Sequence, residues 1–297
     1  MTCTVIVCAY ADERFAQLQA AVESLRAQTS PPDEIVVVVD GNPALLERAY
    51  RAFPDAVVVP SAGPRGLSSA RNTGVARARG EIVAFLDDDA RAAPDWLERL
   101  TAPYADEAVS GVGGWIEPVW LDGRPGWFPD EFGWVVGCSY RGLPAAKAAV
   151  RNLIGANMSF RREVLEDAGG FRADLGRIGT RPLGCEETEL CIRIGGRRRG
   201  SVLLFEPAAR VLHQVPAERT TWRYFKARCY AEGISKAGVA HVAGAAKGLA
   251  SERTHALRVL PKGVVRGPLR RSAAIAAGLA ITTAGYLVGA GRQAVTT

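Results

Sequence analysis

Three consecutive aspartates, Asp87, Asp88 and Asp89, follow a run of five apolar residues in this chain of 297 residues, and Asp40 follows another apolar run. Carboxylates repel a phosphate group unless a divalent cation lies between them. Mg²⁺ and Mn²⁺ prefer oxygen ligands and are often held by one or two carboxylates together with substrate phosphates. The aspartates therefore favour a site for Mn²⁺ or Mg²⁺ and a phosphorylated ligand.

The glycine-rich loops that usually bind phosphate groups are missing from the sequence. The first apolar run is followed by Ala-Tyr-Ala-Asp-Glu at residues 9–13, which is not a G-x-G-x-x-G turn, and no Walker A sequence occurs. A sugar-phosphate nucleotidyltransferase would also need a glycine-rich loop with a basic residue at this point. The sequence therefore disfavours a dinucleotide oxidoreductase, a P-loop enzyme and a nucleotidyltransferase.

Short apolar runs alternate with helical stretches through the first ninety residues. We expect helices near residues 12–28, 43–53 and 68–79, with Ser68 capping the third helix and Pro94 opening the next one. The expected strands lie near residues 4–9, 35–39, 56–59 and 82–86. This alternation predicts an α/β fold with a doubly wound, mostly parallel sheet flanked by helices. Ligands bind at the carboxyl ends of such strands, where Asp40 and the three aspartates fall.

The pattern becomes less regular after residue 93. Four of the six tryptophans lie between residues 109 and 142, which indicates a strand and a long loop that either contacts a ligand or is pinned to the protein body. A helix should end at Ala168. Further strands are expected near residues 157–160 and 201–205, and further helices near residues 187–194 and 221–236.

Ordered segments of the chain resemble the family 2 inverting glycosyltransferases, which have the GT-A fold. The nucleotide-diphospho-sugar-binding half is matched by VIVCAY at 5–10, VVVDG at 37–41, GLSSARNTG at 66–74 and FLDDD at 85–89. The acceptor half and the motif after it are matched by NMSFR at 157–161, GGF at 169–171, CEETELCIR at 185–193 and PAARVLH at 207–213. The resemblance covers about residues 3–235.

This resemblance implies a nucleotide-diphospho-sugar donor and a divalent metal. The residues expected to hold the base, the ribose and the rest of the nucleotide are Cys8, Ala9, Tyr10, Asp40, Arg71, Asp87 and Asp88. Asp89 is the expected metal ligand, with Asp87 as a second ligand. His213 matches a histidine that contacts metal or phosphate in many relatives, although a lone histidine is often only structural.

Glu186 and Glu187 match the acidic pair of the family, whose second member usually acts as general base. Glu187 is one methylene longer than the usual aspartate, so Glu186 and Glu189 are kept as alternatives. All three also suit a helix N-terminus, where the helix dipole favours acidic side chains. The implied reaction is a direct displacement at the anomeric carbon, in which Glu187 deprotonates an acceptor hydroxyl and the configuration is inverted.

The net charge of +6 is concentrated at the C-terminal end of the chain. Residues 253–297 hold seven Arg or Lys and no acidic residue, whereas the rest of the chain carries 30 basic and 31 acidic side chains. This distribution disfavours a nucleic-acid partner. Residues 272–291 are uncharged and long enough to cross a bilayer. They are expected to span the membrane, to lie on its surface, or to pack on the enzyme or on a second subunit of a homodimer.

We accordingly divide the chain into a GT-A domain and a basic helical extension. The domain covers residues 1–235, with a donor half at 1–92 and an acceptor half at 93–235, and the extension covers 236–297. No signal peptide is expected, and the six cysteines should be reduced thiols. The predicted location is the cytoplasm, at the inner face of the cell membrane.

The predicted activity is a metal-dependent inverting transfer to a glycan, lipid-linked or small-molecule acceptor, in the synthesis of envelope polysaccharide or lipid-linked glycan. Two alternatives stay open. One is a cytosolic transferase for a peptide or small natural product, which the apolar C-terminal segment disfavours only modestly. The other is a non-catalytic sugar-nucleotide-binding or scaffold protein, which the presence of Asp89, Glu187 and Arg71 disfavours.

Overall fold

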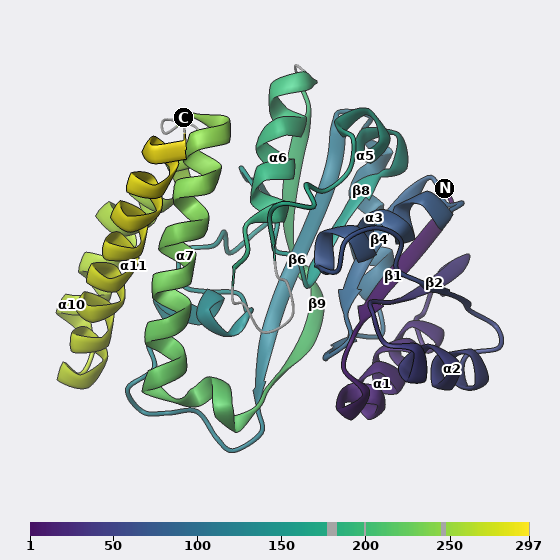
Figure 1. Ribbon diagram of the computed structural model, residues 1–297, viewed down its shortest axis with the longest axis horizontal. Coiled ribbons are helices and arrows are strands. Elements are labelled where there is room, and N and C mark those ends of the chain that lie inside the picture. Colours follow the sequence, from purple (N-terminus) through teal and green to yellow (C-terminus); the bar gives the residue numbers. More distant parts are fainter. Residues whose placement is uncertain (177–182, 199, 245–247, 297) are drawn as a thin grey trace.

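The computed structural model describes residues 1–176, 183–198, 200–244 and 248–296. A twisted sheet runs through the middle of the molecule with helices against it, and the C-terminal helices form a separate flank beside the sheet (Figure 1). The strand order of the sheet is β3-β2-β1-β4-β8-β6-β9-β5, with β7 paired to β9 outside this path.

The donor half supplies four parallel strands, which confirms the expected α/β fold. They are β1 (Cys3–Ala9), β2 (Glu34–Val39), β3 (Val57–Pro60) and β4 (Ile82–Asp87). Alternate residues of β2 enter two different hydrophobic cores: Val37 and Val39 lie in one, and Val36 and Val38 lie in the other. Burial on both faces explains why this strand reads as an unbroken apolar run.

Helices connect these strands at nearly the expected positions. They are the 3₁₀ turn η1 (Asp12–Arg14), α1 (Phe15–Arg26), α2 (Pro43–Ala52), α3 (Leu67–Arg77), α4 (Trp96–Thr101) and the 3₁₀ turn η2 (Ala102–Ala105). The predicted caps of two helices are wrong. Gly66 is the residue that precedes α3, and the Ser68 hydroxyl lies inside the helix, where it donates to the Leu175 carbonyl at 2.8 Å. Pro94 precedes α4, which begins only at Trp96.

The remaining strands complete the sheet in both directions. They are β5 (Ala90–Ala92) at the end of the donor half, and β6 (Val109–Trp120), β7 (Ala148–Ala149), β8 (Asn157–Arg161) and β9 (Val202–Val215) of the acceptor half. β8 is antiparallel to β4 and β6, β9 is parallel to β6, and β5 is antiparallel to β9. The sheet is therefore mixed, and its run of parallel neighbours is β3-β2-β1-β4. The helical elements of the acceptor half include η3 (Asp130–Val136), α5 (Arg162–Ala168), α6 (Glu186–Arg197) and η4 (Ala217–Thr220).

The tryptophan-rich loop is pinned to the body by aromatic contacts. The Trp127 ring packs edge-on against Trp222 and Phe225, with centroids 5.0 and 5.5 Å apart. Both partners belong to α7 (Trp222–Ala243), the long helix that follows η4. The loop and this helix therefore hold each other in place.

The expected domain boundary falls inside α7, because residue 235 lies within that helix. The described helical elements after α7 are α9 (Ala250–Thr254), a π-helical turn (His255–Val259), α10 (Leu260–Arg266) and α11 (Leu269–Thr296). α11 lies along α7 (Figure 1). It is long and apolar enough to cross a membrane, and only about a quarter of its most apolar stretch is buried inside the protein.

Glycines allow the backbones of α7 and α11 to touch. A Cβ at Gly285 of α11 would collide with the Tyr230 carbonyl of α7, and a Cβ at Gly233 of α7 would collide with the Thr282 carbonyl of α11. Gly289, which completes a G-x-x-x-G sequence with Gly285, faces Ile234 and Ala237. Small residues at this spacing permit close approach of two helices.

Gly285→Ala should lower the free energy of unfolding by about 1–3 kcal/mol, because the added methyl group overpacks the contact between the two helices. Gly291→Ala is the matched control, since among the described residues no atom beyond its chain neighbours and its own helix backbone lies within 4 Å of the added Cβ. The control should leave stability unchanged or raise it by up to about 1 kcal/mol through helix propensity. Urea unfolding of both variants measures the difference. Equal stabilities would contradict the close packing of α11 on α7.

Candidate active site

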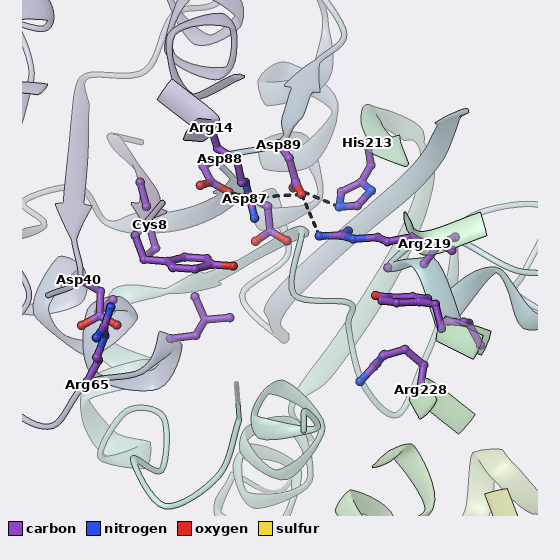
Figure 2. A pocket seen from close by; sticks show the side chains of 18 residues that line it. Cys8, Arg14, Asp40, Arg65, Asp87, Asp88, Asp89, His213, Arg219 and Arg228 are labelled. Carbon is purple, nitrogen blue, oxygen red and sulfur yellow. Dashed lines mark hydrogen bonds and ion pairs between the residues drawn. The ribbon is translucent and has the colours of Figure 1, made fainter. Parts of the chain in front are cut away.

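Two adjoining pockets lie at the carboxyl ends of the parallel strands. The first pocket is lined by Cys8, Ala9, Tyr10, Asp40, Asp87, Asp88, Asp89 and His213, among others (Figure 2). The second pocket is lined by Arg71, Glu186 and Glu187, together with residues of the C-terminal helices. Both pockets are lined by Leu67, Asp87, Gly137 and Arg228. The predicted site residues thus fall into two groups that meet at Asp87.

A candidate metal centre lies in the first pocket. Asp87, Asp89 and His213 each offer one ligand atom, and these atoms lie within 4.8 Å of one another. The short strand β5 brings them together, because it begins directly after Asp89 and pairs with β9 so that Ala90 lies opposite His213. Two carboxylates and an imidazole are a donor set that suits Mn²⁺, and the carboxylates also suit Mg²⁺.

Three basic groups surround the Asp89 carboxylate, which is almost fully buried. His213 Nε2 lies 3.1 Å from one oxygen, and the guanidinium groups of Arg14 and Arg219 lie 3.1 and 3.4 Å from the other. Burial alone would raise the pKa of Asp89, but His213, Arg14 and Arg219 hold this pKa well below its usual range. Although burial opposes a charged imidazole, Asp89 raises the pKa of His213 to about 10. Asp89 is therefore held as a charged carboxylate, which is the form that can bind a metal ion.

Asp88 shares a basic partner with Asp89. Its carboxylate forms an ion pair with Arg14, which also reaches Asp89 (Figure 2). The second oxygen of Asp88 is buried and has no hydrogen-bond partner among the residues that the structure describes. In this arrangement Asp88 anchors Arg14 beside the metal centre.

Asp40 shapes the opposite end of the first pocket. Its carboxylate accepts a hydrogen bond from the Gly66 amide at 2.9 Å, and Gly66 has a φ of 146°, in the region that favours glycine. The Arg65 side chain lies beside Gly41 and lines the same pocket. Asp40 therefore holds the turn before α3 at the pocket rim.

A buried ion pair joins the donor and acceptor halves. Arg71 of α3 donates to Glu186 of α6 at 2.8 Å, and both side chains are about 95% or more buried. The Arg71 guanidinium also lies 3.7 Å from Asp87 and 3.3 Å from the Gly155 carbonyl. A Cβ at Gly155 would meet this guanidinium at 2.6 Å, so a glycine is needed there. Arg71 thus links the first pocket to the second.

Glu187 follows Glu186 at the start of α6 and is half-buried in the second pocket. Burial and the negative charge of Glu186 raise the pKa of Glu187 to about 8, against the opposing effect of Arg71. A raised pKa of this size is typical of a carboxyl group that exchanges protons near neutral pH. Glu189, the remaining alternative, pairs with Arg193 at 2.6 Å and does not line either pocket among the described residues.

The sequence analysis does not predict four arginines that line the first pocket: Arg14, Arg65, Arg219 and Arg228. No motif surrounds them, and a single arginine in a helix or loop is usually a solvated surface residue. The only signal was indirect, since a cluster of buried carboxylates requires positive partners. The six cysteines are free thiols, and burial raises the pKa of Cys8 to about 12.

The C-terminal helices contribute a wall of the second pocket. Residues that line it from this region are Lys236, Ser251, Glu252, His255, Ala256, Leu260, Leu279 and Thr282. Trp134 of the tryptophan-rich loop lines it as well. Trp127 therefore pins the loop to the body and Trp134 lines a pocket, while contact of the loop with a ligand stays a prediction.

Comparison with known proteins identifies a family. The model for glycosyl transferase family 2 matches residues 4–169. The glucosyl-dolichyl phosphate glucuronosyltransferase of Haloferax volcanii is 38% identical over 241 residues, which cover 80% of this chain and 76% of that protein. The succinoglycan biosynthesis protein ExoM of Rhizobium meliloti is 27% identical over 76% of this chain and 71% of its own.

A solved structure shares the fold. The mannosyltransferase PcManGT from Pyrobaculum calidifontis, in complex with GDP-Man and Mn²⁺, superposes with a TM-score of 0.57. The superposition covers 98% of this chain and 86% of that chain, at 23% identity. At this identity the likeness supports the fold alone.

Arg71→Met should lower the free energy of unfolding by about 3–5 kcal/mol, because it leaves Glu186 as a buried charge without its partner. Arg79→Met is the control: Arg79 is exposed and lies 3.8 Å from Glu34, a surface pair worth about 0–1 kcal/mol. The double variant Arg71→Met/Glu186→Leu should recover most of the loss, since no charge stays buried. Urea unfolding of the three variants tests this. Similar losses for Arg71→Met and Arg79→Met would contradict it.

Proposed function

The chain belongs to glycosyl transferase family 2, and we propose that it catalyses metal-dependent, inverting transfer of a sugar from a nucleoside-diphosphate donor to a hydroxyl of a lipid-linked glycan. Membership of this family makes the chain a glycosyltransferase. What we propose in addition is the metal, the site residues, the stereochemistry and the acceptor.

The observation that carries the proposal is the convergence of Asp87, Asp89 and His213 in the first pocket. Their oxygen and nitrogen donors fit Mn²⁺ or Mg²⁺, and the basic groups around Asp89 keep its carboxylate charged, the form in which it can bind a metal. When bound there, the divalent cation would neutralise the charge that develops on the departing nucleoside diphosphate.

The donor is bound by the remaining side of the first pocket. The backbone of residues 8–10 and the carboxylate of Asp40 would hold the base and ribose, as the family resemblance implies. Arg219 and Arg228 line the same pocket from the side of η4 and α7, where they can contact diphosphate oxygens. The sugar would then lie near Asp87, which both pockets share.

Glu187 is the proposed general base in the second pocket. It accepts the proton of the acceptor hydroxyl, whose oxygen forms a bond to the anomeric carbon as the bond from that carbon to the diphosphate oxygen breaks. A single attack from the face opposite the leaving group inverts the anomeric configuration. Glu186 holds Arg71 in place beside Glu187 and Asp87.

Two observations support a lipid-linked acceptor at a membrane surface. The Haloferax volcanii relative carries glucosyl-dolichyl phosphate in its name. Arg270 and Arg271 lie in the first turn of α11, before its apolar stretch. In the sequence given, no acidic residue occurs after Glu252. Basic groups next to an exposed apolar helix favour the inner face of a membrane with anionic lipids.

Asp89→Asn should weaken Mn²⁺ binding at least about tenfold, because a ligand loses its charge. Asp12→Asn is the control, since Asp12 is an exposed aspartate paired with Arg48. Mn²⁺ titration of the protein without nucleotide, followed by electron paramagnetic resonance, measures the affinity. Hydrolysis of UDP-, GDP- or dTDP-sugars should also stop on addition of EDTA and return with Mn²⁺. Hydrolysis or transfer that EDTA does not affect would overturn the metal-dependent mechanism.

The kcat/KM for transfer should rise with pH and reach half its maximum near pH 8, because the base must lose its proton and the pKa of Glu187 is raised to about 8. Glu186→Gln should move this half-point to lower pH, since it removes the adjacent negative charge and leaves the Arg71 charge facing Glu187. Glu187→Gln should abolish transfer and retain binding of the donor. A Glu186→Gln profile identical to that of the wild type would contradict this assignment.

A further inference from the structure

We infer that the second pocket binds an amphiphilic acceptor, with a neutral sugar at its carboxylate end and an apolar chain between η3, α10 and α11. This inference rests on the proposed function and extends it to the residues and the chemistry that select the acceptor. The pocket reaches the site of transfer directly, because Leu67, Asp87, Gly137 and Arg228 line both pockets.

The carboxylate end of the pocket suits hydroxyl groups. Among the described residues that line the pocket, five are acidic and three are Arg or Lys: Asp87, Glu186, Glu187, Glu232 and Glu252 against Arg71, Arg228 and Lys236. Sugar hydroxyls donate hydrogen bonds to carboxylates. Carboxylates offer no attraction to a phosphate, so we place the neutral sugar with the attacked hydroxyl at this end and the phosphate of the acceptor further out.

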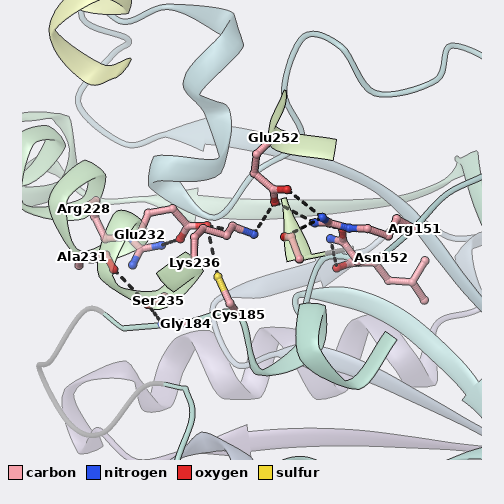
Figure 3. A network of polar contacts seen from close by, with 12 residues as sticks. Arg151, Asn152, Gly184, Cys185, Arg228, Ala231, Glu232, Ser235, Lys236 and Glu252 are labelled. Carbon is pink, nitrogen blue, oxygen red and sulfur yellow. Dashed lines mark hydrogen bonds and ion pairs between the residues drawn. The ribbon is translucent and has the colours of Figure 1, made fainter. Parts of the chain in front are cut away.

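Arg71 and Lys236 of this end are already held by ion pairs. Arg71 contacts Glu186 at 2.8 Å, and the Lys236 ammonium lies 2.7 Å from Glu252 (Figure 3). Glu252 also accepts two hydrogen bonds from Arg151, each 2.8 Å long. Their charges are therefore compensated within the protein, which removes the main attraction for an anionic ligand.

The same contacts tie the C-terminal wall to the helix that carries the proposed base. Glu232 of α7 lies 3.4 Å from Lys236 and accepts a hydrogen bond from the Cys185 thiol at 3.3 Å. Cys185 directly precedes α6 and Glu186. The network from Arg151 to Cys185 in Figure 3 thus sets the distance between Glu187 and the wall formed by α7 and α9.

Apolar side chains from η3, α10 and α11 line the same pocket. Phe132 of η3 and Leu260 of α10 are buried in its wall, and Leu279 of α11 lines it while staying 40% exposed. The C-terminal helices also carry the exposed apolar side chains Leu257, Val265 and Leu269, which are 77%, 83% and 87% exposed. An alkyl chain in this pocket would therefore contact apolar side chains and pass a partly exposed leucine.

Soluble amphiphiles test this inference without requiring catalysis. We would titrate the protein with n-octyl β-D-glucoside, glucose and n-octyl phosphate, each below its critical micelle concentration, and measure affinity by calorimetry. The octyl glucoside should bind at least about tenfold more tightly than glucose, since burial of each methylene contributes to binding. It should also bind more tightly than octyl phosphate, because the charges of Arg71 and Lys236 are already paired with carboxylates and offer a phosphate no free partner.

Two leucines of α11 provide a matched pair of variants. Leu279→Gln should weaken octyl glucoside binding about five- to tenfold and leave glucose binding unchanged. Leu287→Gln should change neither, since Leu287 is 65% exposed on the same helix and does not line the pocket among the described residues. If Leu279→Gln does not fold, the three ligands on the wild-type protein still decide the outcome.

Equal affinities for octyl glucoside and glucose, or equal losses of octyl glucoside affinity in the two variants, would contradict the binding of an apolar chain in this pocket. Tighter binding of octyl phosphate would overturn the neutral sugar at the carboxylate end. Mn²⁺-dependent hydrolysis of nucleotide sugars, measured in parallel, reports on the proposed function separately. Retained hydrolysis without amphiphile selectivity rejects only this inference, whereas selective binding without hydrolysis rejects the proposed function.

Discussion

Both halves of the site depend on the contacts of the buried Arg71 guanidinium. It comes from α3 in the donor half and forms its shortest ion pair with Glu186 at the start of α6 in the acceptor half. Because it also faces Asp87, one positive charge lies between the candidate metal ligands and the candidate base. A buried charge of this kind tolerates little displacement, since each partner would be left unpaired in a poorly solvated place. The two halves are therefore held in one relative position.

A second charge balance operates around Asp89. Three basic groups converge on this carboxylate from three parts of the chain: Arg14 after β1, His213 on β9 and Arg219 on η4. They compensate a charge that the fold buries at the end of the parallel sheet. A divalent cation bound here would add positive charge to a place that already has it, so Arg14 and Arg219 would then be available to the phosphate groups of a donor.

Much of this arrangement could be predicted from the sequence, for identifiable reasons. The apolar runs that end in Asp40 and in Asp87 indicated parallel strands with ligands at their carboxyl ends, because strands buried on both faces have no polar alternation. The order of β8, β6 and β9 could not be predicted, since antiparallel additions to a sheet depend on contacts between distant segments. The sequence predicts that Ser68 caps a helix, but its hydroxyl donates a hydrogen bond to the distant Leu175 carbonyl instead. In the sequence, Glu189 could not be distinguished from Glu186 and Glu187 as a candidate base. In the structure it forms an ion pair with Arg193, one helical turn later.

The position of the C-terminal helices has a consequence for the order in which the protein becomes active during synthesis. Domains generally fold from the N-terminal side as the chain emerges from the ribosome. The four parallel strands and Asp89 come early, so a donor-binding sheet can form while the rest is still being made. Leu260 and Leu279, which line the second pocket, are added well after Asp89. An unfinished chain would thus have the aspartates of the first pocket without the C-terminal wall of the second pocket. The proposed binding of the donor sugar could then precede the proposed transfer to an acceptor.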